Sequence, residues 1–217
     1  MDDGFQHRRL ARHFDILTLD ATDPFGNGHL IPSGKLREPI TSLNRADWIV
    51  LTKTDLVTEQ VLILLKEKIQ KIAPTIPMSE TIYRPVGLSP IFPNVGAVCK
   101  PPFLLKNKNV GILSAIGNPS AFKQTVEQLG CTVTQTYFKR DHSRYSLQDM
   151  EKLVEMEKKK SISCWITTSK DAVKIKPLIH RYSESRTPNL CSNVYELGVE
   201  LVFTQGEPQL WQIISSL

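Results

Sequence analysis

The sequence has few cysteines and no pattern that would pair them. Its 217 residues include four cysteines, with no C-x-x-C pair and no neighbouring histidine at zinc spacing. This argues against a disulfide framework and a structural zinc site, so we expect reduced thiols in a cytoplasmic protein. The four are Cys99, Cys131, Cys164 and Cys191.

Long apolar runs are missing as well. No stretch of the sequence approaches the ~20 apolar residues that a membrane-spanning helix needs. The first residues also lack the charged and apolar regions of a signal peptide. We therefore expect any membrane contact made through this chain to be peripheral.

The sequence does contain enough apolar material for a core, and a mild excess of positive charge. Hydrophobic residues make up 41% of the chain, and 27 Lys and Arg against 22 Asp and Glu give a net charge of +5. The length suits one large or two small domains. The charge favours anionic partners such as nucleotides, phosphorylated substrates or acidic lipid surfaces; nothing singles out nucleic acid, which we do not expect as a partner.

The densest chemistry stands at residues 2–7, which read DDGFQH. Adjacent carboxylates repel one another, so Asp2 and Asp3 stay ionised together only where a cation offsets the repulsion, and oxygen donors favour Mg²⁺ over zinc. Gly4 then lets the chain turn away beside phosphates. The alternative is a charged, frayed N-terminus with an incidental pair of acids.

A long loop is predicted from Thr22 to Pro39, where repeated Pro and Gly rule out any long regular element. Long loops in compact domains are usually functional. Lys35 and Arg37, beside the apolar pair at 30–31, suit an anionic amphipathic ligand. The alternative is a solvated loop with ordinary surface charges.

An apolar run at 47–51 is typical of a strand buried on both faces, and the residues T-K-T-D follow it at 52–55. This arrangement resembles the base-recognition loop of P-loop GTPases, in which the acid, here Asp55, reads a purine edge and the lysine stem, here Lys53, covers the base. Thr52 replaces the usual Asn. The pattern favours a nucleotide-binding parallel sheet and does not choose between guanine and adenine.

The rest of the chain alternates strands with helices, which predicts right-handed βαβ units. We expect strands at 14–20, 47–51, 109–116, 131–138, 162–168 and 193–203, and helices at 8–13, 56–73, 119–128, 147–160, 177–185 and 208–217. A proline-rich segment at 76–103, in which 81–88 and 96–99 pair as a small ribbon, is expected to link two domains.

Two further loops follow strands, at 139–145 and 169–171. Ligands of open α/β sheets gather at such carboxyl ends. His142 beside Asp141 is the best candidate for a proton-handling residue. The alternatives are a surface or structural histidine and, for Lys170 with Asp171, a surface pair of negligible energy.

Taken together, these segments resemble the tetraacyldisaccharide 4'-kinases, the lipid A 4'-kinases of Gram-negative bacteria, over essentially all 217 residues. The segments that carry the resemblance are, in order, DDGFQHRRLARHFDILTLDA, FGNGHLIPSGKLREP, TKTD, AIGNPSAF, FKRDH and TTSKDAVK. The resemblance implies an α/β fold with a P-loop-kinase-like parallel sheet whose N-terminal part is missing. It also implies a smaller C-terminal α/β domain joined by a β-ribbon linker, with the active site in the cleft. The implied divisions are 1–75, 76–103 and 104–217.

By this resemblance the protein would use ATP and Mg²⁺. It would move the γ-phosphate of ATP onto the 4'-hydroxyl of tetraacyldisaccharide 1-phosphate, a lipid A precursor. It would work peripherally at the cytoplasmic face of the inner membrane, although a truncated chain alone would be cytoplasmic.

The resemblance also assigns roles to particular residues. Asp2 and Asp3 would hold Mg²⁺, with Asp3 counted as catalytic. His142 would form a catalytic dyad with an acid that lies upstream of this chain. The nucleotide site would be lined by Asp2, Asp3, Gln6, His7, Lys53 and Asp55. The site for the lipid substrate would be lined by His7, Lys35 and Arg37.

The sequence departs from the family in lacking any G-x-x-x-x-G-K-[S/T], the motif whose backbone nest and lysine cradle the phosphates. We therefore expect an N-terminally truncated enzyme with little or no activity as an isolated chain. Arg140 and Ser143 depart from the family pattern around His142. Two alternatives remain: a GTP-binding regulatory or metallochaperone-like protein, which nucleotide preference would distinguish, and a non-catalytic remnant.

Overall fold

The computed structural model describes residues 4–91, 99–185 and 193–217. By its internal contacts the chain divides into two compact units, Met1–Tyr83 with Leu201–Leu217, and Arg84–Glu200. The last seventeen residues thus belong with the first unit, whereas the sequence placed all of 104–217 together. The three-part division at 76 and 104 stays a prediction.

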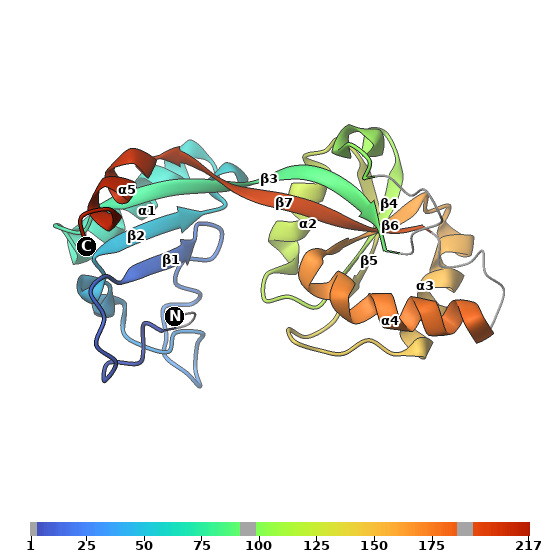
Figure 1. Cartoon of the computed structure of the whole chain (residues 1–217), viewed down its shortest axis with the longest axis horizontal. Coiled ribbons are helices and arrows are strands. Elements are labelled where there is room, and N and C mark those ends of the chain that lie inside the picture. The colour runs from blue at the N-terminus through green and yellow to red at the C-terminus, as the bar shows by residue number, and fades with distance from the viewer. Residues whose placement is uncertain (1–3, 92–98, 186–192) are drawn as a thin grey trace. The chain divides into compact units, whose positions relative to one another are not determined.

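The strands have the order β1-β2-β3-β7-β6-β4-β5, and the pairs β1–β2, β2–β3, β4–β5, β4–β6 and β6–β7 are parallel. The predicted α/β fold with a parallel sheet is confirmed. β3 (Met78–Pro90) and β7 (Val194–Gln205) each contain residues of both units, and the other strands belong to one unit each (Figure 1).

The first unit is built around β2, whose five residues are all buried. Successive side chains of a strand point to opposite faces, so a continuous apolar run needs cover on both. Ile49 and Leu51 pack into a cluster with the helix α1, while Trp48 and Val50 pack against Leu210 of α5. The elements are β1 (Ile16–Asp20), η1 (Ile40–Arg45), β2 (Trp48–Thr52), η2 (Thr54–Leu56), α1 (Glu59–Ile72) and α5 (Glu207–Ile214).

The second unit is built around β4 and β6. Leu113 and Trp165 join a cluster with α3 and α4 on one face, and Ile112 and Ile166 join a cluster with α2 on the other. A Cβ at Gly111 would lie 2.4 Å from Cε3 of the Trp165 indole, so only glycine fits there. The elements are η3 (Pro102–Leu105), β4 (Asn109–Ser114), α2 (Pro119–Glu127), β5 (Thr132–Phe138), α3 (Leu147–Lys160), β6 (Cys164–Thr168) and α4 (Ser169–Ser185).

Two local predictions are wrong. Residues 8–13 form turns and bends instead of a helix. The helix predicted at 177–185 begins at Ser169, so 169–171 is its first turn and no loop. This early start has a local cause, because the Asp171 amide donates to Thr168 Oγ1 at 3.2 Å and thereby caps the helix.

The proline-rich segment contains one antiparallel bridge, whose second residue, Lys100, lies just beyond the partner strand predicted at 96–99. Leu88 and Lys100 form an antiparallel bridge, with N–H···O distances of 2.7 and 2.8 Å between them. Most of the partner strand predicted at 96–99 lies outside the described residues. Among the described residues, no helix is both long and apolar enough to cross a bilayer.

Candidate functional site

The segment Gly4–His7 forms a turn, in which the His7 amide donates to the Gly4 carbonyl at 3.0 Å. The predicted metal ligands Asp2 and Asp3, which immediately precede it, lie outside the described residues. Among the residues that the structure does describe, no group of three or more His, Cys, Asp or Glu could hold a metal ion. The Mg²⁺ site at the acidic pair therefore stays a prediction.

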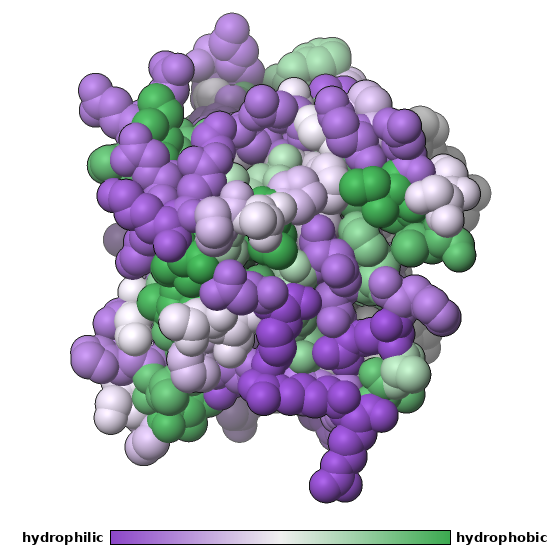
Figure 2. Space-filling view, turned by 90° about the vertical axis from the view of Figure 1, so that its left-hand side faces the viewer, coloured by the Kyte–Doolittle hydropathy of each residue, from purple (hydrophilic) through white to green (hydrophobic). Residues whose placement is uncertain are grey.

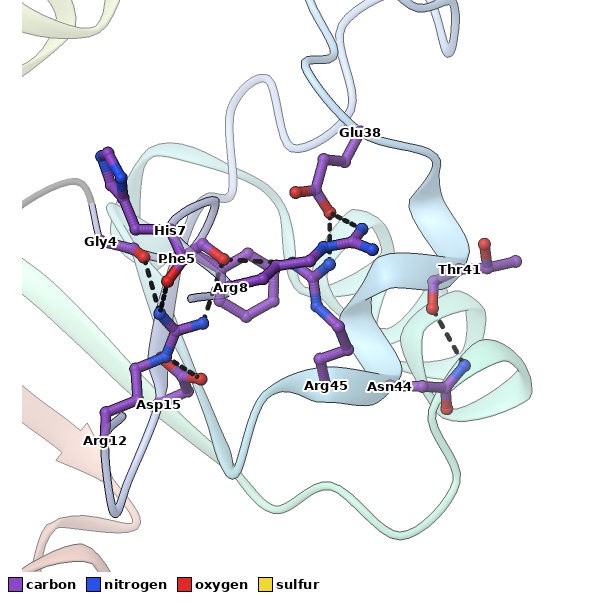
Figure 3. Close-up of polar contacts among 10 residues, drawn as sticks. All are labelled: Gly4, Phe5, His7, Arg8, Arg12, Asp15, Glu38, Thr41, Asn44 and Arg45. Atoms are coloured by element: carbon purple, nitrogen blue, oxygen red, sulfur yellow. Dashed lines mark hydrogen bonds and ion pairs between the residues drawn. The ribbon is translucent and has the colours of Figure 1, made fainter. Parts of the chain in front are cut away.

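Arg12 gathers the carbonyl oxygens of this turn (Figure 3). Its Nη1 donates to Gly4 O at 3.1 Å and His7 O at 2.8 Å, and its Nη2 donates to Phe5 O at 3.3 Å. Its Nε donates to Asp15 Oδ2 at 2.7 Å. The planar guanidinium carries five N–H donors in a rigid fork, which allows one side chain to satisfy all four acceptors.

Arg45 approaches the same turn from η1. Its guanidinium carbon lies 4.4 Å from the centroid of the Phe5 ring, and its Nη2 donates to Phe5 O at 3.2 Å. Glu38 holds Arg45 at 2.8 Å and Arg8 at 3.3 Å. Burial alone would raise the pKa of Glu38, but hydrogen bonds from Arg45, Ser42 and Arg8 outweigh it and lower that pKa.

Two hollows lie beside this turn. One of about 590 Å³ is lined by residues 6–10, including Gln6 and His7. The other, of about 220 Å³, has mostly apolar walls and brings Gln6 together with Arg37 from the long loop. Figure 2 shows one face of the molecule, where hydrophilic side chains predominate and apolar ones gather in separate patches. Through these two hollows the structure groups Gln6 with His7 and with Arg37, which are two of the predicted substrate-binding residues.

The predicted base-recognition residues Lys53 and Asp55 follow the carboxyl end of β2, and Asp20 ends the neighbouring strand β1. Asp20 accepts hydrogen bonds from the amide and hydroxyl of Thr22 at 3.0 and 2.6 Å and forms an ion pair with Lys53. Asp55 is exposed. Parallel strands end at the same sheet edge, so Lys53 and Asp55 stand where nucleotides bind in α/β sheets. Lys53 is held by a carboxylate from the neighbouring strand, which the sequence pattern did not predict.

The long loop from Thr22 to Pro39 contains no helix and no strand longer than the single bridge between Leu30 and Leu36, as predicted. Lys35, which is predicted to face the lipid substrate, donates to Asp23 Oδ2 at 2.5 Å. The hydrogen bond and the charge of Asp23 raise the pKa of Lys35. Leu30 and Ile31 are 44% and 61% exposed, so the apolar side chains of this loop are accessible.

In the second unit, Asp141 and His142 form a tight turn after β5. His142 has a φ of +60°, and its amide donates to Asp141 Oδ1 at 2.9 Å. Lys170 donates to the same oxygen at 3.3 Å. Burial would raise the pKa of Asp141, but these hydrogen bonds and the charge of Lys170 outweigh it, and the pKa is lowered. A Cβ at Gly117 would lie 3.4 Å from Asp141 Oδ2, so the loop after β4 borders this turn.

Asp171 is fully buried, which excludes the interpretation of Lys170 and Asp171 as a surface pair. Asp171 Oδ2 accepts the Ala115 amide at 2.8 Å and the Thr168 hydroxyl at 3.1 Å, and Oδ1 pairs with Lys174 at 3.0 Å. The carboxylate therefore joins the end of β4 to the start of α4. The T-x-x-D spacing of a capping motif was the sequence signal for it.

A second buried carboxylate, Asp149, lies at the start of α3. Its oxygens accept hydrogen bonds from Tyr137 at 2.5 Å, from Lys139 at 2.7 Å and from the Ser146 amide at 2.7 Å. Ser146 and Asp149 form a capping box at the N-terminus of this helix. Burial would raise the pKa of Asp149, but these donors outweigh it and lower the pKa to about 2. Burial and the neighbouring carboxylate raise the pKa of Tyr137 to about 12.

The predicted site residues are thus distributed over both units. Gln6, His7, Lys53 and Asp55, with Lys35 and Arg37, belong to the first unit, and His142 belongs to the second. The structure groups residues within each unit, and a joint site of His142 with the acidic pair stays a prediction. Sequence reasoning missed Arg12 and Arg45, and it considered Asp171 only as part of a surface pair. Phe5 lies forty residues from Arg45 and Ala115 lies fifty-six residues from Asp171, whereas Arg12 has its partners within eight residues.

Comparisons with known proteins connect these features to one family. The model of the LpxK family, described as tetraacyldisaccharide-1-P 4'-kinase, matches residues 1–217. The chain is 31% identical to the tetraacyldisaccharide 4'-kinase of Halothermothrix orenii over 229 residues, covering 99% of this chain and 56% of that protein. It is 32% identical to the enzyme of the same name from Elusimicrobium minutum, covering 93% of this chain and 50% of that one.

A solved structure gives the same result. LpxK from Aquifex aeolicus, a crystal structure described as the "apo" form in complex with ATP, matches with a TM-score of 0.57 and 25% identity. The match covers 99% of this chain and 56% of that one. The chain spans about half the length of the curated relatives it matches.

Proposed function

Because the chain belongs to the tetraacyldisaccharide 4'-kinase family, we propose that it takes part in transferring the γ-phosphate of ATP to the 4'-hydroxyl of tetraacyldisaccharide 1-phosphate, in lipid A biosynthesis. The observation that carries the proposal is the family match over residues 1–217. Phosphoryl transfer depends mainly on positioning and on charge neutralisation. The clusters of charged and hydrogen-bonding side chains in both units are suited to that task.

In this proposal each unit supplies a different part of the chemistry. Gln6 and His7, which line one hollow, would contact the nucleotide. Lys53 and Asp55 would contact its purine base. Bound Mg²⁺, held by Asp2 and Asp3, would neutralise charge on the phosphates. His142, in a turn held by Lys170 through Asp141, would accept the proton of the sugar hydroxyl.

The lipid substrate and its membrane location are part of the same proposal. The exposed apolar side chains Leu30 and Ile31 lie in the loop that also carries Lys35 and Arg37. Apolar and cationic groups together suit an acylated, phosphorylated sugar and an anionic membrane surface. We place the protein peripherally at the cytoplasmic face of the inner membrane.

Nucleotide titration of the isotope-labelled chain tests the first half of the proposal. We expect Mg²⁺ and ATP together to shift the backbone amide signals of residues 6–7 and 53–55. His7→Ala should weaken the response, while His13→Ala, a change at another exposed imidazole nearby, should not. Shifts confined to other residues would contradict the proposal, and a stronger response to GTP would favour the GTP-binding alternative.

A transfer assay tests the second half. With ATP labelled in its γ-phosphate and tetraacyldisaccharide 1-phosphate in mixed micelles, we expect little or no labelled lipid from the chain alone. The reason is that its 217 residues contain no G-x-x-x-x-G-K-[S/T] to cradle the phosphates. Normal turnover would overturn this expectation. Any turnover that survives His142→Ala unchanged would remove His142 from its assigned role.

A further inference from the structure

We propose that Arg12 and Arg45 are positioning residues that hold the main chain of Gly4–His7 in one conformation. In that conformation Gln6 and His7 are presented to the nucleotide site. The functional part of this inference rests on the proposed function. The structural part concerns the turn alone and can be tested without any ligand.

The first observation is the set of acceptors that Arg12 collects. Three main-chain carbonyls within four residues, those of Gly4, Phe5 and His7, all receive N–H groups of this one guanidinium. A short turn has few hydrogen bonds of its own, and its carbonyls would otherwise be solvated independently. A rigid fork that bonds all three fixes their mutual geometry, which a flexible ammonium group cannot do.

The second observation is that Arg12 is itself anchored to the sheet. Its Nε donates to Asp15, whose amide donates to Asp47 Oδ2 at 2.7 Å. The Asp15 carbonyl in turn accepts the amides of Asp47 and Trp48 at 2.9 and 3.2 Å. Trp48 is the first residue of the buried strand β2. The turn is therefore connected to the core of the unit through a continuous series of hydrogen bonds.

Arg45 holds the turn from the other side by a different interaction. Its guanidinium lies over the Phe5 ring and is fixed by Glu38 (Figure 3). A cation over an aromatic face depends on charge and contact area more than on a fork of donors. Lysine should therefore replace Arg45 in part, whereas it should not replace Arg12.

The direction of the peptide groups connects the clamp to ligand binding. The C=O and N–H groups of a trans peptide point in opposite directions, and the peptides of this turn are trans. Because the Gly4 and Phe5 carbonyls face Arg12, the amides of Phe5 and Gln6 are directed away from it. The imidazole of His7 also points away from Arg12 (Figure 3). The clamp thus leaves these amides and the imidazole on the side opposite the guanidinium.

Amide hydrogen exchange on the intact chain tests the clamp. In Arg12→Lys we expect the amides of His7 and Leu10, which donate to Gly4 O at 3.0 Å and His7 O at 3.1 Å, to exchange at least about tenfold faster, equivalent to about 1.4 kcal/mol. Arg45→Lys should give a smaller increase. Arg9→Lys, a change at an exposed arginine of the same segment, should leave exchange unchanged and serves as the matched control.

Two further readouts separate positioning from general loss of structure. Exchange in α1 and β2 should not change in Arg12→Lys, which would show that the unit remains folded. The response of Gln6 and His7 to Mg²⁺ and ATP should be lost while that of Lys53 persists.

The outcomes are decisive in each direction. Unchanged exchange in Arg12→Lys, or equal acceleration in Arg9→Lys, would overturn the clamp. Accelerated exchange with an unaltered nucleotide response at Gln6 and His7 would overturn its positioning role. If the unmodified chain showed no response to nucleotide at all, the proposed function would fail, and the exchange data would still decide whether Arg12 holds the turn.

Discussion

The turn at Gly4–His7 and the carboxyl edge of the second unit organise their loops in opposite ways. In the turn, partly exposed cations collect main-chain carbonyls. In the second unit, the buried carboxylates Asp149 and Asp171 collect N–H and O–H donors. Arginine stays charged at every accessible pH, whereas a carboxylate can be neutralised by acid. The arginine–carbonyl bonds of the turn should therefore tolerate acid, and the carboxylate-centred bonds of the second unit should be stronger and sensitive to pH.

The largest effect should come from removing Asp171. Asp171→Ala leaves the Ala115 amide and the Lys174 ammonium without their buried partner. Loss of one member of a buried charge pair destabilises a protein by about 3 kcal/mol or more. Urea unfolding followed by circular dichroism measures the change. Asp171→Asn keeps an acceptor for the amide and should cost less. Equal losses in the two variants would contradict this and would show that the hydrogen bond to the Ala115 amide contributes nothing beyond the lost charge.

The next effect concerns acid and Asp149. Because the pKa of Asp149 is about 2 in the folded protein and higher when unfolded, its contribution is present above about pH 4 and is lost as the pH falls toward 2. That contribution is roughly 2 kcal/mol. Unfolding midpoints measured between these pH values should fall more steeply for the natural chain than for Asp149→Asn. Parallel curves would contradict the prediction.

The smallest effect should come from an exposed pair, which sets the baseline for this comparison. Arg84 and Glu200 lie 3.4 Å apart with side chains 57% and 50% exposed. Such pairs contribute about 0.5 kcal/mol or less. Arg84→Ala should therefore leave the unfolding midpoint almost unchanged. A loss as large as that of Asp171→Asn would show that exposure does not separate the two classes of interaction.

The sequence predicted most of the fold because the local patterns agree with the tertiary structure. The apolar run ending at Leu51 became a strand buried on both faces, and the helix predicted at 147–160 is observed at Leu147–Lys160. The helix predicted at 8–13 failed because Arg12 bonds to carbonyls and to Asp15 instead of continuing a helical face. Contacts of that kind leave no periodic signal.

The candidate site was less predictable, and the reason is sequence separation. Arg45 and Phe5 are forty residues apart, and the Asp171 carboxylate bonds an amide fifty-six residues away. No local pattern encodes such pairings. By contrast, the lysine of T-K-T-D was found by its motif, although its ion pair with Asp20 was not.

The packing of the tryptophans has a practical consequence. Trp48 is 2% exposed in the first unit, where its indole N–H donates to Ser79 Oγ at 2.8 Å, and Trp165 is 1% exposed against Gly111 in the second. Trp211, at 52% exposure, already meets solvent. Each unit therefore carries its own buried tryptophan. In variants that retain only one of these two indoles, a shift of the fluorescence emission to longer wavelength would show when the unit that contains it unfolds.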